Sequence, residues 1–269
     1  MTINPDWAGA IAGWTRWMQA GNARPATLEL RGSQLRRVAN HFADRSPADL
    51  SPDDLAGWLS AHNWGAETLR SHRSALRTFY RYLVDHGGQP SDPTRLLRSV
   101  RPAPVRVRAA SDAVILPAIA AADDRVALML MLGSFVGLRR GEIARIRPRD
   151  LVRDLFGWSI TIDGKGGRIR TIPLRDDIAM RIAALPGPYA FPGPSGHLTP
   201  AYVGRLMKRA MDGVTTAHQL RHRYATTIYR ASHDIESVRR LVGHASVATT
   251  QRYISVDDDR LREVARFAG

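Results

Sequence analysis

Apolar residues in the first hundred positions recur three and four residues apart, which is the spacing of amphipathic helices. The predicted helices are a tryptophan-rich helix through Trp7, Ile11, Trp14 and Trp17, a second over 27–42, a third after Ser51 and a fourth over about 66–86. Serine is a favourable N-cap and proline fits the first helical turn, so Ser51-Pro52 predicts where the third helix begins. This region is therefore expected to be a small helical bundle.

The later part of the chain is also mostly helical, with one change of period. Apolar positions predict helices over 111–121, 123–135, 175–185 and 199–211. Between them, residues 156–162 and 169–172 alternate with a period of two around a glycine-rich turn, which indicates a β-hairpin. We therefore expect a mainly α protein with a small β-hairpin or sheet, in which an N-terminal helical bundle precedes an α+β C-terminal domain.

A segment with two prolines separates these regions. Pro102 and Pro104 keep the chain extended there, so residues 100–110 are predicted to be a basic linker. The expected domains are then 1–99 and 111–269. The helical pattern starts almost at Met1, so no further N-terminal domain is expected.

Composition narrows the class of protein. The chain has 269 residues, 44% of them hydrophobic, and no cysteine, which excludes disulfides and thiolate metal sites. No run of 18 apolar residues exists, and the first residues do not form a secretory signal. We therefore expect a cytoplasmic location and no membrane partner.

Basic residues are in large excess. The net charge is +14, which favours a polyanionic partner. One helix carries a stripe of arginines at Arg70, Arg73, Arg77 and Arg81, interleaved with serine and threonine. We predict that this stripe and the linker residues Arg106 and Arg108 contact DNA, the alternatives being a solvated helix face and a plain tether. Arginine dominates, since Lys165 and Lys208 are the only lysines.

The last third of the chain carries the candidate chemistry. His218 and Arg221 are three residues apart and share one face of a helix, and His244 and Tyr253 follow. Arginine and histidine donors suit phosphate oxygens, and a tyrosine hydroxyl can serve as the nucleophile. These residue types together indicate phosphoryl transfer.

Two further motifs lie upstream of these residues. Gly137-Leu138-Arg139 forms a turn before a helix, and Lys165 lies in the glycine-rich turn of the hairpin. With the C-terminal residues, they resemble the tyrosine site-specific recombinases, the family of phage integrases and bacterial Xer proteins. The resemblance covers about half of the chain.

The resemblance implies roles for each residue. Arg139 and Arg221 would bind the scissile phosphate, His244 would add a donor, and His218 would accept the tyrosine proton or hold the phosphate. Lys165 would protonate the leaving 5′-oxygen while Tyr253 forms a 3′-phosphotyrosine bond. Glu142 is expected to orient an arginine, or else to be a surface residue, and His222 to support the site or pack the helix.

The resemblance also implies partners. The substrate would be double-stranded DNA carrying specific sites, held between two domains by a homotetramer that passes through a Holliday junction. No cofactor and no metal would be needed, and an accessory DNA-bending or directionality protein is a partner that the family allows. A short helix after Asp257 would pack on its own domain or on a neighbouring copy.

Several functions remain open from the sequence. We favour a phage-type integrase, with a Xer-like dimer resolvase as the alternative. A type IB-like topoisomerase and a non-catalytic DNA-binding protein are more distant alternatives. A zinc site at His218 and His222 is disfavoured because no third ligand is apparent.

Overall fold

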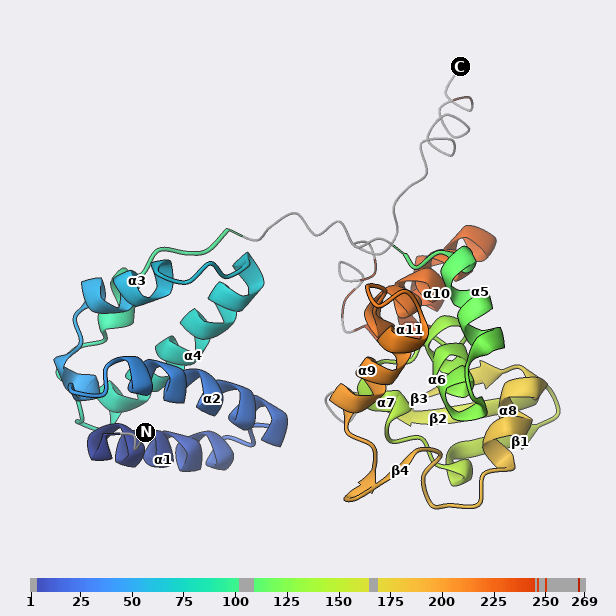
Figure 1. Ribbon diagram of the computed structural model, residues 1–269, viewed down its shortest axis with the longest axis horizontal. Helices are drawn as coiled ribbons and strands as arrows, with labels where there is room; N and C mark the ends of the chain where they lie inside the picture. The colour runs from blue at the N-terminus through green and yellow to red at the C-terminus, as the bar shows by residue number, and fades with distance from the viewer. Residues whose placement is uncertain are drawn as a thin grey trace. The chain divides into compact units, whose positions relative to one another are not determined.

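The computed structural model describes residues 4–101, 109–164 and 169–244, together with Ser246, Thr250 and Arg266. The chain divides into two compact units, Met1–Val105 and Arg106–Gly269 (Figure 1). Within the described ranges, no helix is long and apolar enough to cross a membrane. Each unit has its own hydrophobic core, so each is described separately.

Over residues 4–101, the first unit is a bundle of four helices, as the apolar periodicity predicts. They are α1 (Pro5–Ala20), α2 (Pro25–His41), α3 (Pro52–Ser60) and α4 (Ala66–Asp85), with short 3-10 turns at Pro47–Asp49 and Pro93–Leu96. Ser51 caps α3 by accepting a hydrogen bond from the Asp54 amide at 3.2 Å. In the core, the rings of Trp7 and Phe79 stack with centroids 5.5 Å apart, which joins α1 to α4.

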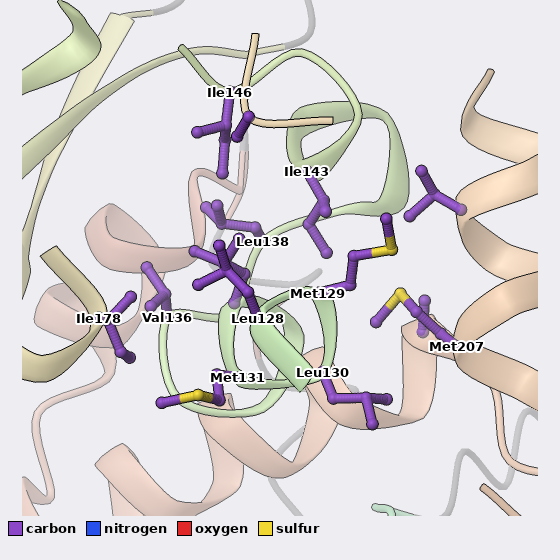
Figure 2. Close-up of a cluster of buried hydrophobic side chains, with 14 of the residues drawn as sticks. Leu128, Met129, Leu130, Met131, Val136, Leu138, Ile143, Ile146, Ile178 and Met207 are labelled. Carbon is purple, nitrogen blue, oxygen red and sulfur yellow. The ribbon is translucent and has the colours of Figure 1, made fainter. Parts of the chain in front are cut away.

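The second unit is built around one buried helix. Among its described residues, the helices are α5 (Asp112–Ala121), α6 (Asp124–Ser134), α7 (Arg140–Ile143), α8 (Asp176–Ala183), α9 (Pro200–Ala210), α10 (Ala217–Ser232) and α11 (Ile235–Val242). Every residue of α6 from Val126 to Ser134 is buried, because α5, α8, α9 and α10 pack around it. Figure 2 shows its leucine and methionine side chains packed with Ile143, Ile178 and Met207.

A three-stranded antiparallel sheet lies in the same unit, in the order β1 (Leu151–Asp154), β2 (Gly157–Asp163) and β3 (Ile169–Leu174) (Figure 1). The predicted hairpin is confirmed, with Ile162 opposite Arg170. The sequence analysis missed β1, which is a short edge strand with little apolar alternation. It also missed the two-residue strands β4 (Pro192–Gly193) and β5 (Gly196–His197), which pair within the proline- and glycine-rich loop.

The predicted linker, residues 100–110, and the short helix predicted after Asp257 fall mostly outside the described ranges. Residues 102–108, which include Arg106 and Arg108, and residues 251–265 are not described. Ala110, placed at the end of the predicted linker, is buried in the core of the second unit and donates its amide to Gln219 O at 3.2 Å.

Candidate active site

The turn after α6 brings Arg139 to the site. Gly137 has a φ of +70°, and a Cβ there would overlap the ring of Tyr224 on α10. Glycine is required for both reasons, since an L side chain is strained at this φ and has no room. The close approach presents the Gly137 carbonyl to Arg221, whose Nη1 donates to it at 2.6 Å. Arg139 follows as the N-cap residue of α7.

Helix α10 supplies His218, Arg221 and His222 from its first two turns. Gln219 caps its start by accepting the Thr216 amide at 2.8 Å. Arg221 is 1% exposed, so its charge needs buried partners. Those include the Gly137 carbonyl, the Val242 carbonyl and the carboxylate of Glu142 at 3.9 Å. The guanidinium is thereby held in one orientation.

The C-terminal end of α11 is bound by three arginines from three different elements. Arg170 Nε donates to Leu241 O at 3.1 Å, Arg221 Nη2 donates to Val242 O, and Arg139 Nη2 donates to Gly243 O at 3.2 Å. The last carbonyls of a helix lack intrahelical partners and carry partial negative charge, so they attract cations. Gly243, with a φ of +65°, ends the helix directly before His244.

Glu142 is the counter-charge of this arginine cluster. Its Oε1 accepts from Arg139 Nη1 at 2.9 Å, and its Oε2 accepts from the Arg139 amide at 2.9 Å. Arg170 donates to both oxygens, at 3.0 and 2.8 Å. Burial alone would raise the pKa of Glu142, but the hydrogen bonds and charge of Arg170, followed by those of Arg139 and Arg221, lower this pKa to about 2. Glu142 is thus a buried, ionised residue, and the surface alternative is wrong.

Two histidines of the predicted set are shifted toward their neutral forms. Burial, and then the charges of Arg221 and Arg139, lower the pKa of His244 to about 3, so its imidazole is neutral at pH 7. Its Nδ1 lies 3.0 Å from Oγ1 of Thr250. Desolvation and the same two arginines also lower the pKa of His218.

His222 lies one turn of α10 after His218, on the same face of the helix. It is 4% exposed, burial lowers its pKa, and its Nδ1 is 3.2 Å from Oγ1 of Thr226. Its burial and its contact with Thr226 fit both roles expected of it, support of the site and packing of the helix. Among the described residues, no three histidine, aspartate or glutamate side chains are grouped so that they could hold a metal ion.

A strongly basic cavity of about 570 Å³ opens over these residues. Its charged and titratable lining residues are Arg139, Arg140, His218, Arg221, Arg205 and Lys208, the last two from α9. None of the described residues that line it is acidic. Several guanidinium groups facing one cavity, with their carboxylate behind them, form a site for an anion with planar or tetrahedral oxygens, such as a phosphate.

The structure brings together Arg139, Glu142, His218, Arg221 and His244. Lys165 and Tyr253 lie outside the described residues. The sequence analysis missed Arg170, Arg205 and Lys208. A signal for Arg170 was available, because it shares the inward face of β3 with Ile172 and Leu174, where a charge requires a buried partner.

The arginine stripe lies along α4 in the first unit. Arg70, Arg77 and Arg81 are exposed, and Arg70 and Arg81 pair with Glu67 and Asp85 on their own helix. Arg73 is half-buried, because its Nη2 donates to Leu97 O at 2.6 Å. Arg70, Arg73 and Arg77 line a shallow pocket of about 410 Å³ with Ser74 and Thr78.

Two family models match the chain, the phage integrase family over residues 199–260 and the phage integrase N-terminal SAM-like domain over residues 12–87. Tyrosine recombinase XerC of Rhodospirillum centenum is 34% identical, over 98% of this chain and 87% of that protein. The chain belongs to the tyrosine recombinase family. XerD of Caulobacter vibrioides is 31% identical, over 89% of this chain and 89% of that protein.

The recombinase also has the family fold. It resembles the XerH recombinase in its post-cleavage complex with palindromic difH, with a TM-score of 0.71 at 22% identity over 91% of this chain and 80% of that one. It resembles a lambda integrase dimer on a COC′ core site, with a TM-score of 0.74 at 20% identity over 92% and 77%. The expected family, enzyme class and fold class are therefore confirmed, and a topoisomerase or a non-catalytic protein is not supported.

Proposed function

We propose that this recombinase is a Xer-like enzyme that cleaves and rejoins double-stranded DNA at specific sites through a 3′-phosphotyrosine intermediate. The observation that carries the proposal is the basic cavity in which Arg139 and Arg221 are held by backbone carbonyls and by a buried carboxylate. Their orientation is set before any anion enters. Donors arranged in advance around a developing charge are a major source of catalysis.

In the proposed reaction, Arg139 and Arg221 bind the non-bridging oxygens of the scissile phosphate. The phenolic oxygen of Tyr253 attacks phosphorus, the P–O5′ bond breaks, and Lys165 donates a proton to the departing 5′-oxygen. Rejoining runs the same steps in reverse with a 5′-hydroxyl as the nucleophile. The covalent bond conserves the energy of the phosphodiester, so the chemistry requires no nucleotide cofactor.

His218 and His244 suit different parts of this reaction. His218 lines the cavity and its lowered pKa leaves it neutral at pH 7, so it can accept the proton of Tyr253. His244 is buried beside Arg221 and Arg139 and can donate from a neutral imidazole to a phosphate oxygen. Arg221 and Arg139 remain charged throughout.

We further propose that the first unit binds the DNA duplex through the α4 stripe. Arg70, Arg77 and Arg81 are exposed along one helix, and Ser74 and Thr78 lie among them. Arginine and hydroxyl side chains are common phosphate contacts. Arg73 contributes less directly, since it already bonds the Leu97 carbonyl. Arg106 and Arg108 would extend the contact along the backbone.

The assembly that exchanges strands would be a homotetramer on two synapsed sites. A lambda integrase tetramer bound to a Holliday junction has the same fold as this chain, with a TM-score of 0.74. An accessory DNA-bending or directionality protein fits the same scheme. Since the substrate would be bacterial DNA, we place the enzyme in the bacterial cytoplasm.

Resolution of identical sites is better supported than phage integration, which the sequence analysis favoured. The relatives that match at 31–34% identity over about nine-tenths of the chain or more are XerC and XerD proteins. A plasmid carrying two copies of one site tests this proposal, because a resolvase recombines identical sites and an integrase needs two different ones. Recombination only between non-identical sites would contradict the resolvase proposal and favour an integrase.

The covalent intermediate is tested first. A binding site is recovered by selection from random duplexes, and a nick is placed just downstream of the cleavage position, so that the short fragment released with a free 5′-hydroxyl diffuses away and cannot be rejoined. A protein–DNA adduct that survives SDS and is absent from Tyr253→Phe is the expected result. Binding without an adduct, on a site verified by footprinting, would contradict the proposed chemistry.

A further inference from the structure

Arg170 occupies an unusual position for a charged residue. It lies on the inward face of β3, directly after the hairpin turn, and its side chain is only 11% exposed. It does not line the basic cavity and so has no direct access to an anion bound there. Its hydrogen bonds connect it instead, through intermediate groups, to Arg139, which does line the cavity.

One set of contacts leads to Arg139 through Glu142. The two terminal nitrogens of Arg170 donate to the two oxygens of Glu142, at 3.0 and 2.8 Å. Such a paired contact fixes the plane of the carboxylate. The same two oxygens accept the guanidinium and the backbone amide of Arg139. The orientation of the Arg139 side chain therefore depends on a carboxylate that Arg170 holds.

A second set of contacts leads to the end of α11. Arg170 Nε donates to Leu241 O at 3.1 Å, and its Cδ and Nη1 lie 3.0 Å from where a Cβ on Gly243 would stand. The Gly243 carbonyl accepts from Arg139. Arg170 thus stabilises both groups that bind the Arg139 guanidinium, which are the Glu142 carboxylate and the C-terminal end of α11 with the Gly243 carbonyl.

We propose that Arg170 is a positioning residue for DNA cleavage, which holds the Arg139 guanidinium in place through Glu142 and the C-terminal end of α11. The inference rests on the proposed function, in which Arg139 binds the scissile phosphate. Arg221 is less dependent on Arg170, because its main partners are the carbonyls of Gly137 and Val242. The effect of losing Arg170 should fall on Arg139.

A double-mutant cycle on the full chain tests this dependence. Single-turnover cleavage of the nicked duplex is measured for wild type, Arg170→Met, Arg139→Lys and the double variant. A misplaced catalytic group costs on the order of 100-fold, so Arg170→Met is expected to slow cleavage by roughly 10- to 100-fold. In the Arg139→Lys background the same change should cost less than about 3-fold, because residues that act through one another are not additive.

A pH series separates positioning from loss of stability. Arg170 is the largest influence that keeps the pKa of Glu142 low, so Arg170→Met should raise that pKa and make cleavage decline on acidification at a higher pH than in wild type. Wild type should show no decline from this group at that pH. Adding Glu142→Gln to Arg170→Met should remove the new pH dependence, since the amide cannot titrate.

Arg175→Met is the matched control. Arg175 also pairs with a carboxylate through two nitrogens, at 3.1 and 2.7 Å from Asp177, but on the surface just beyond β3. It should cleave at the wild-type rate. Equal losses for Arg170→Met in both backgrounds, or a loss independent of pH, would overturn the inference while wild type still forms its adduct. Absence of the adduct in wild type would instead refute the proposed function.

Discussion

Glu142→Gln is expected to destabilise the second unit by about 3 kcal/mol at pH 7. The pKa of Glu142 falls from 4.5 to about 2, and each unit corresponds to ~1.4 kcal/mol of interaction with the ionised form. The carboxylate is 3% exposed, so solvent screening is weak. Loss of one partner from a buried ion pair typically costs ~3–5 kcal/mol, which agrees with this figure.

The pH dependence of this effect follows from the sign of the shift. Since the folded pKa lies below the unfolded one, the stabilisation by Glu142 is complete above about pH 4.5 and is lost as pH falls toward about 2. The difference in stability between wild type and Glu142→Gln should therefore be full at pH 7 and much smaller at pH 3.

Because the chain has two units, stability is best read locally. The urea dependence of hydrogen exchange, followed by mass spectrometry on peptides from α6 and α10, reports the second unit alone. Asp177→Asn, in the exposed pair with Arg175, should cost under ~1 kcal/mol. A Glu142→Gln cost below that of Asp177→Asn, or one that is equal at pH 7 and pH 3, would refute the reasoning.

Three further predictions concern single residues. The His244 imidazole should remain neutral down to about pH 4, because its pKa is lowered to about 3, and an NMR titration near pH 6.5 would contradict its burial. Gly137→Ala should cost at least ~2 kcal/mol more than Gly213→Ala in the same exchange measurement, since both have positive φ but only Gly137 meets the Tyr224 ring; equal costs would contradict this contact. Arg77→Ala should reduce the slope of log Kd against log salt by about 0.9, and an unchanged slope would remove Arg77 from the DNA contact.

The local pattern of the chain determined its elements. Apolar residues spaced three and four apart predicted α1 through α4, α5, α6, α8 and α9 within a few residues, because a helix buries one face at that period. Alternation predicted the β2–β3 hairpin. Edge strand β1 was missed, because its side chains bury almost no surface and its own residues therefore carry no strand pattern. It forms because it pairs with the neighbouring strand β2.

The order of the Gly-Leu-Arg turn, the hairpin lysine and the C-terminal histidines, arginine and tyrosine also determined the family and the candidate site residues. Arg139, His218, Arg221 and His244 were identified by motif, and the fold brings them into one cluster. These motifs do not distinguish a resolvase from an integrase, because both kinds of enzyme use the same cleavage chemistry. Only the comparison with whole relatives favours the Xer-like function.

Only the tertiary structure decided how the site is held. Arg139, Arg170 and Arg221 come from three elements and bind three consecutive carbonyls at the C-terminal end of α11. The partners are separated in sequence by 104, 71 and 21 positions, respectively. No local period predicts contacts over such separations, because they depend on how α6, α10 and β3 pack. The burial of Glu142 has the same origin, since its carboxylate stays ionised only where the folded chain supplies these cations.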